Sequence, residues 1–252
     1  MARRNRKPIA EGSATKTLDE IESAGDRLVF WLAENQRPIL AAAAGILIVA
    51  GGWGYVSSST EEANSQADTA LSEVQTEYRL AMGAAPGSIS IPELANPEAA
   101  REIREEYIER YTAVGAAHAG SGPGGVAFLE AGRLHQALGD SEAAVMSYQA
   151  GLDSLSDGDA LRGFLWSRLG SVYEQAEQWA EAANAYTQAS TTANYALQAG
   201  DRAAAIRAYI HAGEPSAALG MADELVRSEP NFTLPKFLQA QLDELRVGTT
   251  SD

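Results

Sequence analysis

The sequence contains no cysteine, only three histidines and few runs of β-branched residues. A chain without cysteine forms no disulfide, has no thiol nucleophile and offers no thiolate to a metal. The histidines His118, His135 and His211 are not spaced as metal ligands, and the sequence has no H-E-x-x-H, G-x-S-x-G or G-x-x-x-x-G-K-[ST] motif. We therefore expect no catalytic residue, metal, cofactor or small-molecule substrate. An enzyme with a site assembled from scattered residues is the alternative.

Basic residues are also scarce, because 19 Lys and Arg stand against 34 Asp and Glu, and the formal net charge is −15. The imbalance lies in one part of the chain. Residues 1–37 carry seven basic and six acidic side chains, so residues 38–252 carry 12 basic and 28 acidic ones. A surface with this charge repels phosphates and anionic lipid headgroups, which argues against nucleic acid as a partner.

Charge is absent from residues 38–60, and within them Ile39–Val56 is apolar or glycine throughout. About 20 such residues in a helix cross the hydrocarbon core of a bilayer. Trp31 precedes this stretch and Trp53 lies near its end. Aromatic side chains of this kind prefer the headgroup region of a membrane. We predict a single transmembrane helix over residues 38–56. The alternatives are a buried core helix or a cleaved signal peptide, although the preceding tail is longer than the usual basic leader of a signal peptide.

The distribution of Lys and Arg around this segment predicts its orientation. Seven basic residues precede it, whereas the first basic residue after it is Arg79. Basic residues near a membrane favour the cytoplasmic side, so we expect the tail, residues 1–37, in the cytoplasm and the acidic part outside it. Small residues at four-residue spacing, Ala41/Gly45 and Ala50/Gly54, would let a second membrane helix approach closely.

Beyond the predicted anchor, we expect a stalk helix and loop over residues 57–95. Ser58-x-x-Glu61 is a capping box that favours the start of a helix. The stretch Gly83–Pro97 is rich in glycine and proline, which is typical of a loop. The remaining residues, 96–252, are predicted to form a repeat domain.

The repeat domain is predicted to begin with a helix that has Asn96 as its N-cap and Pro97 in its first turn. Gly120–Gly125 (GSGPGG) then interrupts the apolar periodicity. No Lys follows this glycine-rich stretch, so it lacks the pattern of a phosphate-binding loop, and we expect a flexible connector there.

A repeated pattern of large and small residues follows this connector. Its clearest copy is Trp166-x2-Leu169-Gly170-x2-Tyr173, then Ala182-x3-Tyr186-x2-Ala189. These are the positions that a 34-residue tetratricopeptide repeat uses to pack two antiparallel helices, with small residues where the backbones approach. A weaker copy precedes it, from Phe128 through the turn Gly139-Asp140 to Gly151, and another follows it, from Tyr209 through the turn Gly213-Glu214-Pro215 to Ala222.

The repeats depart from a 34-residue period by insertions near Ser156–Asp159 and Asn194–Gly200. A last helix with Leu238, Leu242 and Leu245 on one stripe is suited to cap the array. The predicted fold class is therefore all-α: a transmembrane helix, a helical stalk and a tetratricopeptide-like solenoid of antiparallel helix pairs. An unrelated array of helical hairpins is the alternative.

Repeat arrays of this kind present a surface lined by first-helix residues that do not fill the core. In the predicted register these are nine residues: Leu129, Arg133, Gln136, Phe164, Ser167, Ser171, Glu174, Arg207 and His211. The Lys and Asn side chains with which some chaperone adaptors bind a C-terminal carboxylate are absent, because Leu129, Arg133 and Arg168 stand in their place. A groove of mixed polarity is better suited to an extended segment or a partner helix.

The order of these features resembles a known family. An acidic helix containing Asp26–Asn35 (DRLVFWLAEN) precedes an anchor that ends in Gly52-Trp53-Gly54-Tyr55, and degenerate repeats begin near Ala127–Ala131 (AFLEA). This layout resembles YfgM-type proteins, ancillary subunits of the SecYEG translocon. The resemblance implies an inner-membrane protein with its N-terminus in the cytoplasm, its repeats in the periplasm, and the translocon and periplasmic chaperones such as PpiD as partners. A scaffold for another envelope process, such as cell-wall or outer-membrane assembly, is the alternative.

Overall fold

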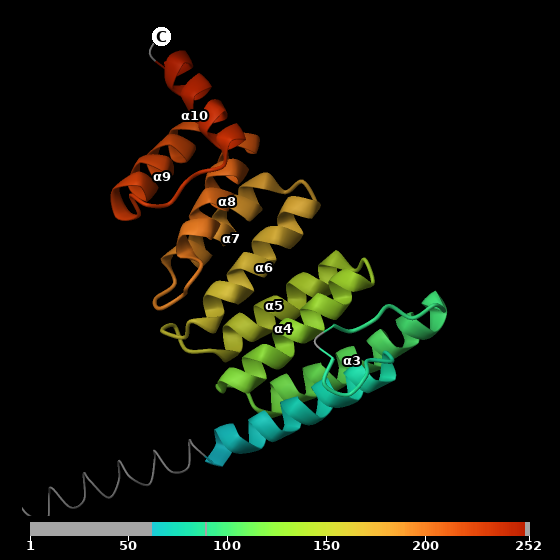
Figure 1. Ribbon diagram of the computed structural model, residues 1–252. Coiled ribbons are helices and arrows are strands. Elements are labelled where there is room, and N and C mark those ends of the chain that lie inside the picture. The colour runs from blue at the N-terminus through green and yellow to red at the C-terminus, as the bar shows by residue number, and fades with distance from the viewer. Residues whose placement is uncertain (1–61, 89, 250–252) are drawn as a thin grey trace, which may run out of the picture. The chain divides into compact units, whose positions relative to one another are not determined.

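The computed structural model describes residues 62–88 and 90–249, and the regular structure within these residues is helical (Figure 1). These described residues belong to one compact unit. The predicted tail and the predicted transmembrane helix over residues 38–56 lie outside the described residues. Within the described ranges, no helix combines the length and the apolar character needed to cross a membrane.

The first described helix, over residues 62–81, packs against α3 (Pro97–Ala117). Its buried Tyr78 lies between two tyrosines of α3, with ring centroids 5.3 Å from Tyr107 and 6.4 Å from Tyr111. The same apolar cluster extends to buried residues of the next helix, α4 (Gly122–Ala137). The described part of the expected stalk therefore belongs to the same unit as the repeats, because its apolar stripe is buried against α3.

The start of α3 follows the prediction. The side-chain oxygen of Asn96 accepts hydrogen bonds from the backbone N–H groups of Glu98 and Ala99, at 3.0 and 3.4 Å. Pro97 occupies the first turn, where a backbone N–H has no acceptor within the helix, so the lack of this N–H in proline costs no hydrogen bond. This confirms Asn96 as the N-cap.

Six helices form three pairs that follow one another in chain order (Figure 1). The pairs are α4 with α5 (Ser141–Ser154), α6 (Leu161–Gln175) with α7 (Trp179–Thr191), and α8 (Gln198–His211) with α9 (Pro215–Ser228). Consecutive helices pack against each other, and the first helices of neighbouring pairs, α4 with α6 and α6 with α8, are also in contact. The predicted tetratricopeptide-like array of helix pairs is thus confirmed as a fold.

The turn inside each pair has the same geometry. A residue with positive φ follows the first helix of each pair, namely Gly139 (φ 78°), Glu177 (φ 56°) and Gly213 (φ 75°). The next residue in each turn donates its N–H to a carbonyl five residues earlier, as Asp140 does to His135 at 2.9 Å. This left-handed ending satisfies carbonyls that the helix leaves unpaired. The predicted turns at Gly139 and Gly213 are confirmed, and Glu177 adopts the same conformation without the advantage of glycine.

The flexible connector expected over Gly120–Gly125 is wrong for most of its length, because α4 begins at Gly122. Ser121 caps this helix by accepting a hydrogen bond from the N–H of Gly124 at 3.1 Å. A β-carbon on Gly124 would lie 2.3 Å from the carbonyl oxygen of His118. The low helix propensity of glycine is outweighed here by an approach of α4 to the end of α3 that only glycine allows.

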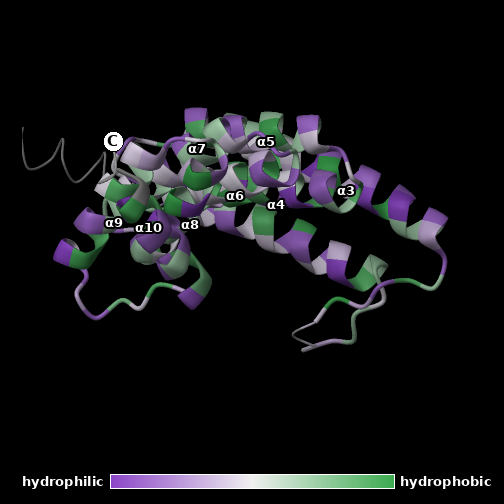
Figure 2. Ribbon diagram, turned by 90° about the horizontal axis from the view of Figure 1, so that it is seen from above, coloured by the Kyte–Doolittle hydropathy of each residue, from purple (hydrophilic) through white to green (hydrophobic). Residues whose placement is uncertain are grey.

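The last helix, α10 (Lys236–Thr249), closes the end of the third pair. Its Leu238 and Leu242 are almost fully buried, in one cluster with Ile206 of α8 and Leu225 of α9, which confirms these two residues of the predicted capping stripe. Leu245, the third, is partly buried. Figure 2 shows hydrophobic and hydrophilic segments alternating along the helices, as expected where each helix buries one side.

Candidate protein-binding surface

The nine residues predicted to line a groove all lie on the first helices of the three pairs. Leu129, Arg133 and Gln136 are on α4, Phe164, Ser167, Ser171 and Glu174 are on α6, and Arg207 and His211 are on α8. Several of them are occupied by contacts within the chain. These contacts determine which side chains can meet a partner.

Gln136 and Glu174 hold tyrosines of the second helices. The Tyr148 hydroxyl donates to Oε1 of Gln136, and the Tyr186 hydroxyl donates to Oε2 of Glu174 at 2.8 Å. Burial raises the pKa of Tyr148 to about 12, and burial together with the bond to Glu174 raises the pKa of Tyr186. Both phenols therefore stay protonated at neutral pH and act as hydrogen-bond donors.

The tyrosine rings themselves cover glycines of the first helices. A β-carbon on Gly132 would lie 2.3 Å from the Tyr148 ring, and one on Gly170 would lie 2.7 Å from the Tyr186 ring. The predicted role of Gly170 as a point of close helix approach is thus confirmed. In each of these two pairs, the first helix supplies the small residue and the second helix supplies the ring, so both pairs make the same kind of close contact.

Glu174 also joins the second pair to the third. The Nη2 atom of Arg207 on α8 lies 2.8 Å from Oε2 of Glu174, the same oxygen that accepts the Tyr186 hydroxyl. Both side chains are only partly exposed, at 24% for Glu174 and 33% for Arg207. Among the described residues, the buried Nε of Arg207 has no acceptor. The carboxylate therefore serves as a junction between three helices, α6, α7 and α8.

A second junction joins the same two pairs through Asp201, which is only 6% exposed. Its Oδ1 accepts a hydrogen bond from the Ser167 hydroxyl at 2.7 Å, and its Oδ2 accepts one from the Tyr195 hydroxyl at 2.6 Å. Burial raises the pKa of the Asp201 carboxyl, while these two hydroxyls and the nearby Arg168 act in the opposite direction. Ser167, a predicted groove residue, is thus committed to the contact between α6 and α8.

Tyr195 comes from the insertion between α7 and α8 and packs on α6. A β-carbon on Gly163 would lie 2.3 Å from the Tyr195 ring. Phe164, the next residue, meets the same ring edge-on, with centroids 4.9 Å apart and planes at 83°. Through Tyr195, the insertion therefore contacts both the second and the third helix pair, and it supports the exposed side chain of Phe164.

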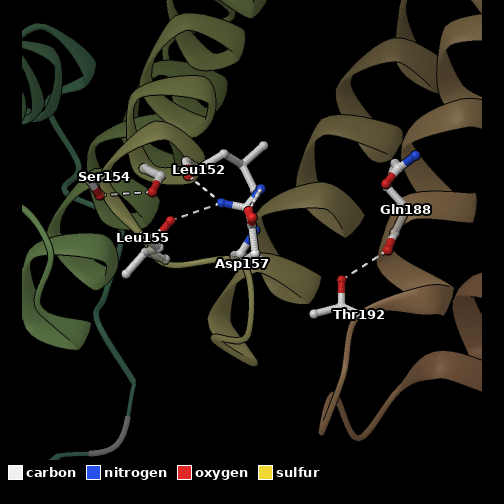
Figure 3. Close-up of polar contacts among 8 residues, drawn as sticks. Leu152, Ser154, Leu155, Asp157, Gln188 and Thr192 are labelled. Carbon is white, nitrogen blue, oxygen red and sulfur yellow. Dashed lines mark hydrogen bonds and ion pairs between the residues drawn. The ribbon is translucent and has the colours of Figure 1, made fainter.

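The other insertion, between α5 and α6, is also held by specific contacts. The Arg162 guanidinium donates to the carbonyl oxygens of Leu152 and Leu155, at 2.6 and 3.1 Å, and lies 3.6 Å from Asp157 (Figure 3). Figure 3 also shows the Thr192 hydroxyl donating to the Gln188 carbonyl, where α7 ends. Specific hydrogen bonds therefore hold the chain at the ends of α5 and α7, where the two insertions follow.

The remaining predicted residues differ in their surroundings. His211 is stacked on Trp179, with ring centroids 4.3 Å apart. Arg133 is paired with Glu130 of its own helix at 2.8 Å. Leu129 is partly buried against the apolar cluster that contains Tyr148 of α5 and Leu165 of α6. None of these contacts tests whether the residues bind a partner, so their assignment to a groove stays a prediction.

The comparisons with known proteins assign no family to this chain. No protein-family model matches the chain, and no curated protein sequence matches it either. Among solved structures, the chain is similar to a crystal structure of nearly identical TPR-like repeats from a Podosopora anserina protein described as a kinesin light chain. The two are 16% identical with a TM-score of 0.46, and the match covers 72% of this chain and 89% of the other.

Sequence reasoning missed two residues that shape this surface, Tyr195 and Asp201, and did not count Arg168 among the groove residues. Tyr195 and Asp201 lie in or next to an insertion, where the repeat pattern makes no prediction. Arg168 stands between two predicted groove residues, one turn after Phe164, and is exposed. The spacing of Phe164 and Arg168 on one helix was the available signal.

Proposed function

We propose that this chain is a non-catalytic scaffold that holds other proteins against the exposed side of its first repeat helices. The observation that carries the proposal is the exposed face of α6, which lies beside α8, the helix joined to it by the Glu174–Arg207 and Ser167–Asp201 contacts. A surface built on helices that are already joined loses little freedom when a partner docks. Stacked repeats use such surfaces to bind extended segments or helices.

We further propose that the predicted helix over residues 38–56 anchors this scaffold in a bacterial inner membrane, with the tail in the cytoplasm and the repeats in the periplasm. The uncharged stretch and the seven basic residues before it support this orientation. A tether raises the effective concentration of a weak binding surface, to about millimolar for short linkers. Modest contacts are then sufficient for association.

In this setting, the proposed partners are the SecYEG translocon and periplasmic chaperones such as PpiD, with the chain as an ancillary subunit that links them. The layout of acidic helix, anchor and degenerate repeats supports this assignment through its resemblance to YfgM-type proteins. The same parts would also suit a scaffold for cell-wall or outer-membrane assembly, so the partners must be identified by experiment.

Site-specific crosslinking in native membranes tests the proposal. A photoreactive residue at Phe164, in the full chain, should capture translocon subunits or chaperones, identified by mass spectrometry. Met146 on α5 is the matched control position, because it is a large apolar residue with 67% exposure on a second helix. Capture of cell-wall or outer-membrane assembly proteins from Phe164 would assign the alternative function. Equal capture from both positions would refute binding through α6.

A further inference from the structure

One face of α6 carries an ordered stripe of accessible side chains. Phe164, Arg168, Ser171 and Gln175 follow one another at spacings of four, three and four residues, which places them on one side of the helix. Phe164 is 40% exposed, Arg168 and Gln175 are exposed, and Ser171 is partly buried. The stripe therefore presents an aromatic ring and a guanidinium one helical turn apart.

The aromatic end of the stripe is held in place. Phe164 packs edge-on against Tyr195, and the hydroxyl of Tyr195 is fixed by Asp201. An exposed ring supported in this way keeps its orientation before a partner arrives, so less conformational entropy is lost on binding. Leu197, 54% exposed, stands two residues further along the same insertion.

The cationic end of the stripe forms no direct ion pair within the described residues, although its charge acts on the buried Asp201 carboxyl and favours a lower pKa there. Among the described residues, Arg168 forms no ion pair or hydrogen bond, whereas seven other arginines each reach a carboxylate. Other described arginines, such as Arg202 and Arg227, also lie outside the ion pairs, so Arg168 is distinguished by the supported aromatic ring of Phe164 one turn before it.

We infer that this stripe binds a protein segment that presents an aliphatic or aromatic side chain and a carboxylate about 6 Å apart, the spacing of side chains one helical turn apart. The apolar side chain contacts Phe164, and the carboxylate pairs with Arg168. The inference rests on the proposed scaffold function and names the chemistry of its partner. It is carried by charge complementarity, because an exposed unpaired guanidinium beside a supported aromatic ring matches an opposite charge beside an apolar group.

The surroundings of the stripe restrict the segment further. The net negative charge of the domain repels any chain with many acidic residues, so polyanions are excluded at long range. A segment with one or two carboxylates experiences little of this repulsion and gains the local pairing. The stripe thus selects its partner by long-range repulsion of strongly acidic chains together with one attractive contact at Arg168.

Peptide selection followed by charge reversal tests this inference. The probe is a phage-displayed library of random dodecapeptides, selected on the full chain in nanodiscs. The expected peptides carry Asp or Glu within four residues of an aliphatic or aromatic residue. A synthetic copy of the most enriched peptide should bind the Arg168→Glu variant at least tenfold more weakly by fluorescence anisotropy, and Phe164→Ser should weaken binding similarly.

Replacing the peptide carboxylate with Lys should restore binding to Arg168→Glu, a result that an unfolded variant would not give. Arg227→Glu on α9 is the matched control, since it makes the same charge change at an exposed position and should leave the affinity unchanged. Selection of Lys- or Arg-rich peptides, no enrichment, or no rescue by charge reversal would overturn the inference. Self-association abolished by Arg168→Glu would also overturn it and assign the stripe to a second copy of the chain. If the inference fails in any of these ways, crosslinking from Phe164 to envelope proteins would still support the proposed scaffold function.

Discussion

Glu174 and Arg207 form an ion pair of 2.8 Å that joins the second helix pair to the third, at an oxygen that also accepts the Tyr186 hydroxyl. Removing Glu174 leaves both donors without this acceptor in a partly buried site. We expect Glu174→Ala to lower the free energy of unfolding by about 1–3 kcal/mol. Urea unfolding, followed by Trp fluorescence, measures this change.

A double-mutant cycle isolates the contact between the pairs. Glu174→Ala and Arg207→Ala should show a coupling energy of at least about 0.5 kcal/mol, because the two groups share one contact. The exposed pair Arg101–Glu105 is the control, and Arg101→Ala should change stability by less than about 0.5 kcal/mol. Additive effects of Glu174→Ala and Arg207→Ala would show that the ion pair does not couple the repeats.

Gly170 offers a test of the packing inside the second pair. A β-carbon there already lies 2.7 Å from the Tyr186 ring, so Gly170→Leu must force α6 and α7 apart. The expected destabilisation is about 1–3 kcal/mol or more. Ser171→Leu, one residue on and directed away from Tyr186 in the repeat register, should change stability by about 0.5 kcal/mol or less. Equal tolerance of both substitutions would contradict this helix register.

Glu177 occupies the left-handed position that glycine occupies in the other two turns. A side chain in this conformation costs roughly 1 kcal/mol, so Glu177→Gly should stabilise the domain by about 0.5–1 kcal/mol in spite of the greater freedom of the unfolded chain. Gly213→Ala, the converse change at the equivalent turn, should destabilise it by a similar amount. Thermal unfolding of both variants checks the signs, and a loss of stability in Glu177→Gly would show that its side chain has an unrecognised contact.

Asp201 should make stability depend on pH. Its pKa is raised in the folded protein above the ordinary value of 3.8, so the folded state holds this proton to higher pH than the unfolded state does. The stabilising contribution is therefore complete below pH 3.8 and is lost as pH rises through the folded pKa. Relative to an Asp201→Asn variant, the native chain should lose unfolding free energy as pH rises through this window. A difference that does not vary with pH would contradict the raised pKa.

The proposed topology predicts the behaviour of reporter fusions. A reporter that is active only in the periplasm should be active when fused after Asp252 and inactive when fused at Met1. Replacing Arg27 and Arg37 with acidic residues should reduce this orientation, because it removes basic charge from the cytoplasmic side. The opposite pattern of reporter activity would reverse the proposed localisation.

The elements that local sequence specifies were largely predictable. Asn96 as an N-cap, the glycine turns at Gly139 and Gly213, and the close approach at Gly170 follow from residues whose backbone or size has one main structural use. Glycines at Gly122–Gly125 were misassigned because the same residue also serves helices that pack unusually close, and sequence alone does not distinguish the two uses.

The partly buried polar residues show the opposite case. In the repeat register, Ser167, Glu174 and Arg207 are indistinguishable from exposed surface positions that could bind a partner. Their pairing across helices joins residues 33 or 34 positions apart, and it depends on how the insertion carrying Tyr195 sets one helix pair against the next. Amphipathic periodicity by itself determined the helices and the residues that each pair buries, because apolar side chains at this spacing lie on the one face of each helix that packs into the core. Only the tertiary structure decided which polar groups satisfy each other and which, such as Arg168, remain exposed, because that depends on distances between helices that no local pattern encodes.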